Sequence, residues 1–355
     1  MNIIIDILTP KQCMFFSKLS EELERRGHQI SKTTRKYREV IELLKLKGVQ
    51  AKVVGEHGGK ELMDKLRASA QRTIELTSIF KDLKPDVALS FSSPEMARVS
   101  YGLKVPHICI NDSPHAEAVA RLTVPLSKIL LTPKMIPKRA WTRFGISSED
   151  IVQYYALDPW VWLKDFEPDR TILKELGLDE SKPILTIRTE EAFAAYLLGK
   201  TQKETSVTGI IDRLLEAPKP PQIVAVPRYD EQIKALQKAL GDRIVICGST
   251  VDGPSLLGYT SVFIGAGGTM TTEAALLGVP TFSCYPDKPF LILEYLIEKN
   301  LVTRETDPEK LVNGILTTLA GVDHQKKKQA RKAQRLVRSF EDPIDVIIAE
   351  LEKLA

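Results

Sequence analysis

Short apolar runs that are typical of β-strands alternate with amphipathic helical stretches along most of this chain of 355 residues. The alternation begins with an isoleucine-rich run at 2–8. The next stretch, 11–26, has apolar residues at helical spacing and is followed by Gly27. Strands that alternate with helices are typical of α/β domains built on parallel sheets. The sequence therefore predicts an α/β protein.

The same alternation runs through the chain twice. The first series of predicted strands is 2–8, 29–33, 51–54, 87–91, 107–110 and 129–131; the second is 183–188, 222–226, 244–247, 262–264 and 281–283. We predict two Rossmann-like, doubly wound domains that face a central cleft, spanning residues 1–160 and 168–322. The joint between them falls near 154–168, a stretch that is rich in aromatic residues and proline. Residues 323–355 are expected to form C-terminal helices that pack back on the N-terminal domain, with a kink at Pro343 in a helix over 325–354.

Charge and cysteine content exclude several classes of protein. Fifty Lys and Arg stand against 46 Asp and Glu, so the net charge of +4 is too small for a protein that coats DNA. The four cysteines form no Cys-x-x-Cys pair, which argues against a zinc ribbon, an iron–sulfur site or a disulfide scaffold. We expect no metal site and no cofactor.

Apolar runs are all much shorter than a membrane span, and the N-terminus lacks the features of an export signal. We therefore expect a cytoplasmic protein. The first of two basic stretches leaves peripheral contact with the inner membrane face as an alternative, and the second raises nucleic-acid binding as one. The first, between Glu117 and Glu149, mixes cations with apolar residues; the second is the basic face around 326–338. We interpret both as ordinary solvated surface, and nucleic-acid binding is not favoured because no aromatic residues interleave with the second.

The most informative motif is a glycine-rich turn within 263–283, FIGAGGTMTTEAALLGVPTFS. A predicted buried strand leads into Gly267, Gly268 and Thr269, and a helix follows. Glycines at this position let backbone N–H groups approach an anion, and the helix N-terminus adds partial positive charge. We expect these three residues to contact a diphosphate, with the Thr269 hydroxyl either capping the helix or donating to a phosphate oxygen.

Glu273 lies about one turn further along this helix. A carboxylate there can accept two ribose hydroxyls. The alternative is a strand–turn–helix without a ligand, in which Glu273 is a surface charge. Two other fingerprints do not fit: Met270 occupies a glycine position of GxGxxG, and Tyr259 follows Gly258 where a P-loop needs lysine.

The run GAGGTMTTEAALLGVPTFS resembles the donor-site signature of GT-B-fold enzymes that use sugar nucleotides, such as the UDP-N-acetylglucosamine 2-epimerases and the MurG-type N-acetylglucosaminyltransferases. With the TPKQ start, the HGG loop and NDSPHAEAVARLT, the chain resembles a mainly archaeal family of predicted GT-B glycosyltransferases. The resemblance implies a UDP-sugar substrate held by the C-terminal domain, with Gly267, Gly268 and Thr269 on the diphosphate and Glu273 on the ribose. The acceptor side then falls to the N-terminal domain, and the acceptor, lipid-linked or glycan, is not identified.

Candidate catalytic residues follow the fifth predicted strand, in the run NDSPHAE. Sugar transfer needs a base that deprotonates an acceptor hydroxyl, and Asp112, His115 or Glu117 can serve near neutral pH. Asp112 and Glu117 also fall in the region where the 2-epimerases hold acidic catalytic residues. As alternatives, Asp112 can form a turn before Ser-Pro, and His115 can be a structural loop residue.

Several cations and one loop are candidate contacts for the acceptor or for phosphate. Lys11 follows the first strand, His57 and Gly58 follow the third, and Arg121 lies just beyond the NDSPHAE run; Arg228 follows a strand of the second half. Each of these also has an ordinary structural explanation, as a solvated lysine, a tight turn or a helix-entry loop.

Two departures from the epimerase pattern favour a transferase. Arg188 stands where the epimerases carry a histidine, and it suits a diphosphate, because a guanidinium pairs with phosphate oxygens. The acidic–arginine motif after the last strand is also missing. We therefore expect a metal-independent glycosyltransferase that uses a UDP-sugar, with UDP-sugar epimerase or hydrolase and a non-catalytic sugar-nucleotide-binding protein as alternatives.

Overall fold

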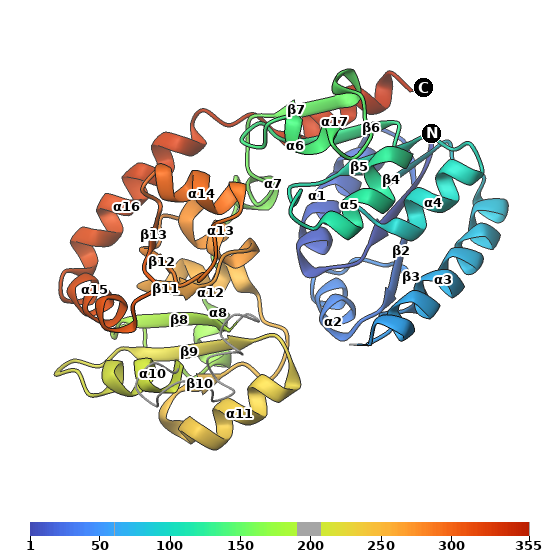
Figure 1. Ribbon diagram of the computed structural model, residues 1–355. Helices are drawn as coiled ribbons and strands as arrows, with labels where there is room; N and C mark the ends of the chain where they lie inside the picture. The colour runs from blue at the N-terminus through green and yellow to red at the C-terminus, as the bar shows by residue number, and fades with distance from the viewer. Residues whose placement is uncertain (60, 190–206, 355) are drawn as a thin grey trace. The chain divides into compact units, whose positions relative to one another are not determined.

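The computed structural model describes residues 1–59, 61–189 and 207–354, which divide into two compact units (Figure 1). The first unit comprises Met1–Trp162 together with Phe340–Ala355, and the second comprises Leu163–Ser339. Each contains one all-parallel sheet with helices on it, so the α/β class predicted from the sequence is confirmed. Residues 323–339 belong to the second unit, whereas the sequence assigned all of 323–355 to the N-terminal domain.

The sheet of the first unit has seven parallel strands in the order β3-β2-β1-β4-β5-β6-β7. They are β1 (Asn2–Ile7), β2 (Gln29–Lys36), β3 (Lys52–Glu56), β4 (Val87–Ser90), β5 (His107–Ile110), β6 (Ile129–Pro133) and β7 (Ile151–Tyr154). β1 pairs with β2 and β4, so its isoleucine-rich run is central and buried. The strand order reverses between β1 and β4, the position where open α/β sheets bind ligands. β7 is not among the strands that the sequence predicted.

Helices cover both faces of this sheet, because the chain winds outward from β1 in two directions. The helices are α1 (Pro10–Arg25), α2 (Arg38–Leu46), α3 (Leu62–Leu83), α4 (Pro94–Gly102), α5 (Glu117–Thr123), α6 (Arg139–Thr142), α7 (Trp160–Leu163) and α17 (Pro343–Glu352), with short 3₁₀ turns at Val124–Leu126 and Ser148–Asp150. α1 and α2 pack together, and α3, α4 and α5 lie side by side as a second layer (Figure 1).

A fully buried histidine connects three segments of this unit. His107 at the start of β5 is 1% exposed; its Nε2 lies 2.9 Å from the Ser90 hydroxyl and its Nδ1 lies 3.0 Å from the Ser127 hydroxyl. Ser127 donates to the Thr123 carbonyl, so it accepts from Nδ1–H, and Ser90 donates to Nε2. Burial lowers the pKa of His107 to about 3. The imidazole of the folded protein is therefore neutral at pH values above about 3.

We expect His107 to make stability depend on pH. Between pH 6.5, the ordinary pKa of histidine, and about pH 3, the unfolded chain binds a proton at this residue and the folded chain does not. The contribution of His107 to the free energy of unfolding is therefore complete above pH 6.5 and falls as the pH is lowered. When the pH is lowered from 6.0 to 4.5, the free energy of unfolding of the His107→Gln variant should fall by about 2 kcal/mol less than that of wild type. Urea unfolding followed by tryptophan fluorescence measures this in the first unit, because all three tryptophans lie there. Equal pH dependence in both proteins would contradict it.

The second unit repeats the same architecture with six parallel strands in the order β10-β9-β8-β11-β12-β13. They are β8 (Ile184–Thr189), β9 (Gln222–Pro227), β10 (Val245–Ile246), β11 (Val262–Gly265), β12 (Thr281–Ser283) and β13 (Val302–Arg304). The described helices are α8 (Thr171–Glu175), α10 (Val207–Leu215), α11 (Asp230–Leu240), α12 (Gly253–Tyr259), α13 (Thr269–Leu276), α14 (Leu291–Glu298), α15 (Pro308–Ala320) and α16 (Val322–Val337), with a 3₁₀ turn at Gly241–Arg243. Both units thus have the Rossmann-like strand order that the sequence predicts.

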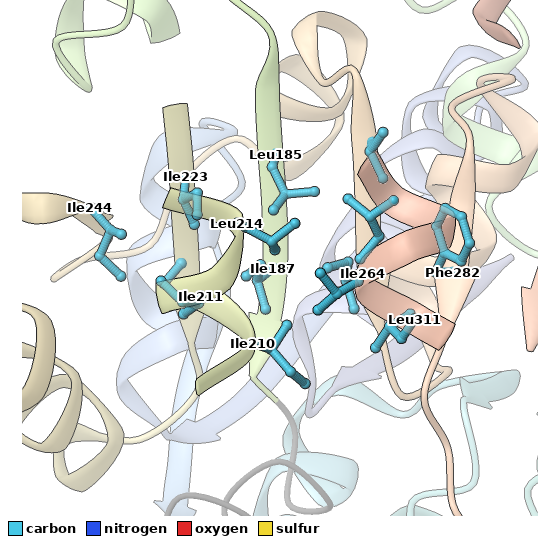
Figure 2. Close-up of a cluster of buried hydrophobic side chains, with 14 of the residues drawn as sticks. Leu185, Ile187, Ile210, Ile211, Leu214, Ile223, Ile244, Ile264, Phe282 and Leu311 are labelled. Atoms are coloured by element: carbon cyan, nitrogen blue, oxygen red, sulfur yellow. The ribbon is translucent and has the colours of Figure 1, made fainter. Parts of the chain in front are cut away.

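One face of the second sheet is closed by α10 and α15. Figure 2 shows Leu185 and Ile187 of β8 packed against Ile211 and Leu214 of α10, all of them at most 1% exposed. Leu311 of α15 extends the same cluster toward β11. This core fixes β8 and β11, whose carboxyl ends carry the glycine-rich turn and its neighbours.

Two separate helices end the chain, where the sequence predicted one kinked helix over 325–354. α16 ends at Val337, and α17 begins at Pro343 with the Asp342 side chain accepting from the Ile344 N–H at 3.0 Å. Proline at the first position of a helix starts it, because its missing N–H has no partner there anyway. α17 buries Ile344, Ile347 and Leu351 in the first unit.

Candidate active site

Lys11 is the centre of a cluster of charged side chains at the carboxyl edge of the first sheet. It lies in the first turn of α1, which Thr9 caps by accepting from the Gln12 N–H at 3.5 Å. The Lys11 Nζ lies 2.6 Å from Asp112 Oδ2, just after β5, and 2.5 Å from Asp158 Oδ2, just after β7. The structure therefore brings together two of the predicted site residues, Lys11 and Asp112, that are a hundred positions apart in the sequence.

Asp158 and Tyr154 complete this cluster, and the sequence analysis did not identify either. The Tyr154 hydroxyl donates to Asp158 Oδ1, and both residues are at most 1% exposed. They lie in the aromatic stretch that was predicted to be a linker. The sequence held one signal for them, because Asp158 follows the strand-like run 151–154 by four residues. That spacing is informative only once 151–154 is known to be a strand of the sheet, β7.

Electrostatics separate the two aspartates of the cluster. Burial alone would lower the pKa of Lys11, but Asp112 and Asp158 outweigh it and raise the pKa of this ammonium above its ordinary value. Burial opposes ionisation of Asp112, yet Lys11 and the Ser113 hydroxyl hold its pKa below the ordinary value. Burial and the neighbouring Asp112 raise the pKa of Asp158. Two carboxylates with pKa values moved in opposite directions are a common arrangement for acid–base chemistry.

His115 lies in the turn after Asp112, partly exposed to solvent and within electrostatic reach of the Asp112 carboxylate. Burial of the ring lowers the pKa of His115, while the Asp112 carboxylate acts in the opposite direction. Glu117 is oriented differently. Its carboxylate accepts from Arg121 at 2.6 Å on the exposed surface of α5, and this hydrogen bond lowers the pKa of Glu117. Of the three predicted bases, Asp112 is therefore paired with Lys11, His115 lies within electrostatic reach of Asp112, and Glu117 is paired with Arg121.

The loop of His57 and Gly58 folds against the protein itself. The His57 ring stacks on Tyr37 with ring centroids 4.8 Å apart. A Cβ on Gly58, whose φ is +76°, would lie 2.8 Å from the Lys65 Cα of α3. The close backbone approach at this glycine is thus to α3, as in the tight turn that the sequence analysis kept as an alternative.

A fully buried ion-pair network lies under β1 in the same unit, and sequence analysis gave no sign of it. The Arg72 guanidinium of α3 binds Asp6 of β1 with distances of 2.5 and 2.9 Å and lies 3.4 Å from Glu95 of α4. The Thr33 hydroxyl donates to Asp6, and the Arg72 Nε donates to the Val54 carbonyl. Arg72 and Asp6 are at most 1% exposed. This network joins β1, β3, α3 and α4.

In the second unit, the glycine-rich turn has the conformation that the sequence predicts. Gly267 and Gly268 have φ values of +112° and +83°, and Gly268 is the N-cap of α13. The hydroxyls of Thr271 and Thr272 donate to the carbonyls of Gly267 and Gly268 at 2.9 and 3.2 Å. These two bonds hold the turn through its carbonyl groups, and the N-cap Gly268 makes no side-chain cap bond. The first N–H groups of α13 form the kind of helix N-terminus that binds anions.

Glu273 is buried beside this turn. It is 4% exposed, so it is not the surface charge that the sequence analysis kept as an alternative. A Cβ built on Gly253 at the start of α12 would lie 4.0 Å from the Glu273 Oε2, which places the carboxylate toward that glycine. A carboxylate close to a glycine-rich helix start is suitably placed to accept hydrogen bonds from the ribose hydroxyls of a nucleotide.

The two predicted arginines of this unit lie at the carboxyl ends of its strands. Arg188 near the end of β8 donates to the carbonyls of Val226 and Pro227 at 3.3 and 3.2 Å. Arg228 follows β9 and is exposed, with its guanidinium 5.5 Å from the Tyr229 ring centroid. Within the described residues, no three His, Cys, Asp or Glu side chains are grouped as metal ligands, and no helix is long and apolar enough to cross a bilayer.

The chain is similar to known proteins in both sequence and fold. A protein of Methanocaldococcus jannaschii, "Uncharacterized protein MJ0665", is 31% identical over 318 residues, covering 88% of this chain and 90% of that protein. The UDP-GlcNAc 2-epimerase of Neisseria meningitidis, solved with UDP-GlcNAc bound, has a TM-score of 0.74 at 16% identity, covering 99% of this chain and 100% of that one. Spinosyn forosaminyltransferase SpnP has a TM-score of 0.63 at 16% identity, covering 100% of this chain and 99% of that one.

These likenesses to epimerases and glycosyltransferases show a GT-B-like fold of two Rossmann-like units, as the sequence resemblance implies. The family model described as "Protein of unknown function (DUF354)" matches residues 1–354. This match covers both units, the Lys11 cluster and the glycine-rich turn. The chain therefore belongs to the DUF354 family.

Proposed function

We propose that the protein is a glycosyltransferase that moves a sugar from a UDP-sugar to an acceptor hydroxyl, with UDP-N-acetylglucosamine as the first donor to test. The observation that carries the proposal is the buried Glu273, one turn beyond two glycines of positive φ. In this assignment Gly267, Gly268 and Thr269 bind the diphosphate through backbone N–H groups, and Glu273 accepts the ribose hydroxyls. Arg188 adds positive charge near the diphosphate that leaves.

The Lys11 cluster supplies the base in this proposal. The acceptor oxygen attacks the anomeric carbon of the sugar, the bond from that carbon to the diphosphate breaks, and UDP leaves with its electron pair. The acceptor proton passes to Asp112, or to His115 beside it. Lys11 supports this role because it keeps the Asp112 carboxylate ionised. A base of this kind typically contributes a factor of about 10²–10⁴ in rate.

A UDP-sugar epimerase is the second candidate. It is favoured by the TM-score of 0.74 to the Neisseria enzyme, against 0.63 to the forosaminyltransferase. An epimerase or hydrolase changes the sugar nucleotide when no acceptor is present, and a transferase does not. Incubation of the protein with UDP-N-acetylglucosamine alone, followed by NMR of the sugar ring, separates the two. If UDP-N-acetylglucosamine stays unchanged both alone and with a panel of acceptors, the protein binds a sugar nucleotide without acting on it.

We expect the Glu273→Gln variant to bind UDP at least about tenfold more weakly than wild type, because the ribose hydroxyls lose a charged acceptor. Wild type should also prefer UDP to 2′-deoxy-UDP, and Glu273→Gln should lose most of this preference. Isothermal titration of the two ligands into both proteins completes a double-mutant cycle. The cycle isolates the ribose contact from any general effect of the substitution on folding.

Glu298→Gln, an exposed residue at the end of α14, is the matched control and should bind UDP as wild type does. If Glu273→Gln retains the preference for UDP over the deoxy compound, Glu273 does not contact the ribose. If wild type binds GDP or NAD and no uridine compound, the donor assignment itself is wrong.

A further inference from the structure

The outward face of α16 in the second unit is a row of basic side chains. The exposed residues of this helix and its C-cap recur every three or four positions, so they share one face. The row consists of His324, Lys327, Lys328, Arg331, Arg335 and Arg338. The whole helix carries six Lys and Arg and one carboxylate, Asp323. No described residue forms an ion pair with any of the five Lys and Arg of the row.

The inner face of α16 is fixed to the second unit. A Cβ on Gly278, at the end of α13, would lie 2.5 Å from the Ala330 Cα, so the two helices pack in close contact there. Gln329 donates to the Leu301 carbonyl at 2.7 Å, and Lys332 donates to the Asn300 carbonyl at 3.0 Å. Ala333 is 2% exposed. The helix therefore presents its outer row from a fixed support.

We infer that the outer face of α16 binds an anionic lipid surface, with Lys327, Lys328, Arg331 and Arg335 as its principal contacts. Clusters of four to eight Lys and Arg on one helix bind anionic bilayers, and each cation strengthens binding by about fivefold. A cation that is already paired with a carboxylate contributes little to the binding of an anionic surface. The lack of such carboxylate partners among the described residues is therefore what makes this row suitable for binding. A straight row that spans about 21 Å, at 1.5 Å per residue, fits a planar surface of charged headgroups.

One observation favours a bilayer over nucleic acid. No Phe, Tyr or Trp lies between 322 and 339, so the face lacks the large aromatic side chains on which single-stranded bases usually stack. The basic stretch between Glu117 and Glu149 is different, because three of its six cations, Arg121, Lys138 and Arg143, are engaged with the protein. Arg121 pairs with Glu117, and Arg143 donates to the Pro114 carbonyl at 2.9 Å. Its apolar members Leu130, Trp141 and Phe144 are buried in the first unit. In the outer row of α16, by contrast, none of the five Lys and Arg is paired with a described carboxylate.

The test is sedimentation of the full-length protein with vesicles at about 0.1 M salt. The vesicles contain phosphatidylcholine with or without about one-third phosphatidylglycerol. Wild type should pellet with the anionic vesicles only and be released by about 1 M salt. The variant Lys327→Gln/Lys328→Gln/Arg331→Gln/Arg335→Gln should bind at least about tenfold more weakly. A conservative variant, Arg331→Lys/Arg335→Lys, should bind as wild type does.

The matched control removes the same charge elsewhere on the second unit. Lys174, Lys219, Lys234 and Lys238 are exposed, and their joint replacement by Gln should leave vesicle binding unchanged. The inference is overturned if wild type ignores anionic vesicles, or if the control loses binding as much as the α16 variant. It is also overturned if RNA or duplex DNA displaces the protein from the vesicles and binds it more tightly. None of these outcomes depends on sugar transfer, which the Glu273 titrations test separately.

Discussion

The Asp112→Asn variant is expected to release UDP from the donor and acceptor pair about 10³-fold more slowly than wild type, while its affinity for UDP stays within about twofold. The amide cannot accept a proton from the acceptor hydroxyl, and it also loses the charged contact to Lys11 at 2.6 Å. The UDP contacts proposed above lie in the second unit, so the effect should appear in kcat and not in UDP binding. Steady-state rates and UDP titrations of the same preparation measure both quantities.

The control for this experiment is Asp82→Asn, an exposed acid at the end of α3, which should keep wild-type rates. His115→Gln distinguishes the two candidate bases. Suppose that His115→Gln loses about 10³-fold in rate, whereas Asp112→Asn retains more than about a tenth of the wild-type rate. The histidine is then the base, and Asp112 orients it. If both variants keep wild-type rates, the Lys11 cluster has no part in proton transfer.

Arg72→Met is expected to destabilise the first unit by about 3–5 kcal/mol, because it leaves the Asp6 and Glu95 carboxylates buried without their cation. The removed guanidinium makes two contacts to Asp6, one to Glu95 and one to the Val54 carbonyl. Methionine fills a similar volume, so most of the loss comes from charge and hydrogen bonding. Urea unfolding followed by tryptophan fluorescence reports on this unit.

Arg67→Met tests whether any arginine of α3 has the same effect. Arg67 is exposed one turn earlier on the helix, and its replacement should change the free energy of unfolding by less than about 0.5 kcal/mol. An Arg72→Met protein as stable as Arg67→Met would mean that the network contributes nothing to stability. An Asp6→Ala/Arg72→Met protein should be more stable than Arg72→Met alone, because it no longer buries an unpaired Asp6.

The sequence predicted the elements whose signal is local. The isoleucine run of β1 and the glycine pair before α13 have this property, because apolar spacing and glycine content can be read within about ten residues. The same local analysis missed β7, where a four-residue strand lies among aromatic residues. It also joined α16 and α17, because Pro343 was interpreted as a kink and not as the first residue of a new helix.

The parts of the site that could not be predicted depend on contacts between distant residues. Lys11 and Asp112 were each identified, but their pairing, and the place of Asp158 beside them, follow from strand order. The burial of Glu273 is of the same kind. Its position on the helix was predictable, whereas its 4% exposure results from α12 packing over α13. Strand order and helix packing are tertiary properties, and no local pattern contains them.

The return of the chain to its first unit has a consequence for the order of folding during synthesis. The seven strands of that unit leave the ribosome before residue 163, but α17 leaves only after the entire second unit. α17 supplies Ile344, Ile347 and Leu351 to the core of the first unit, and Phe340 packs edge-on against Tyr155 and Trp160. Domains usually fold in the order in which they are made. Here the first unit reaches its final core only after the second unit has been made, so the domain made second is the first that can finish folding.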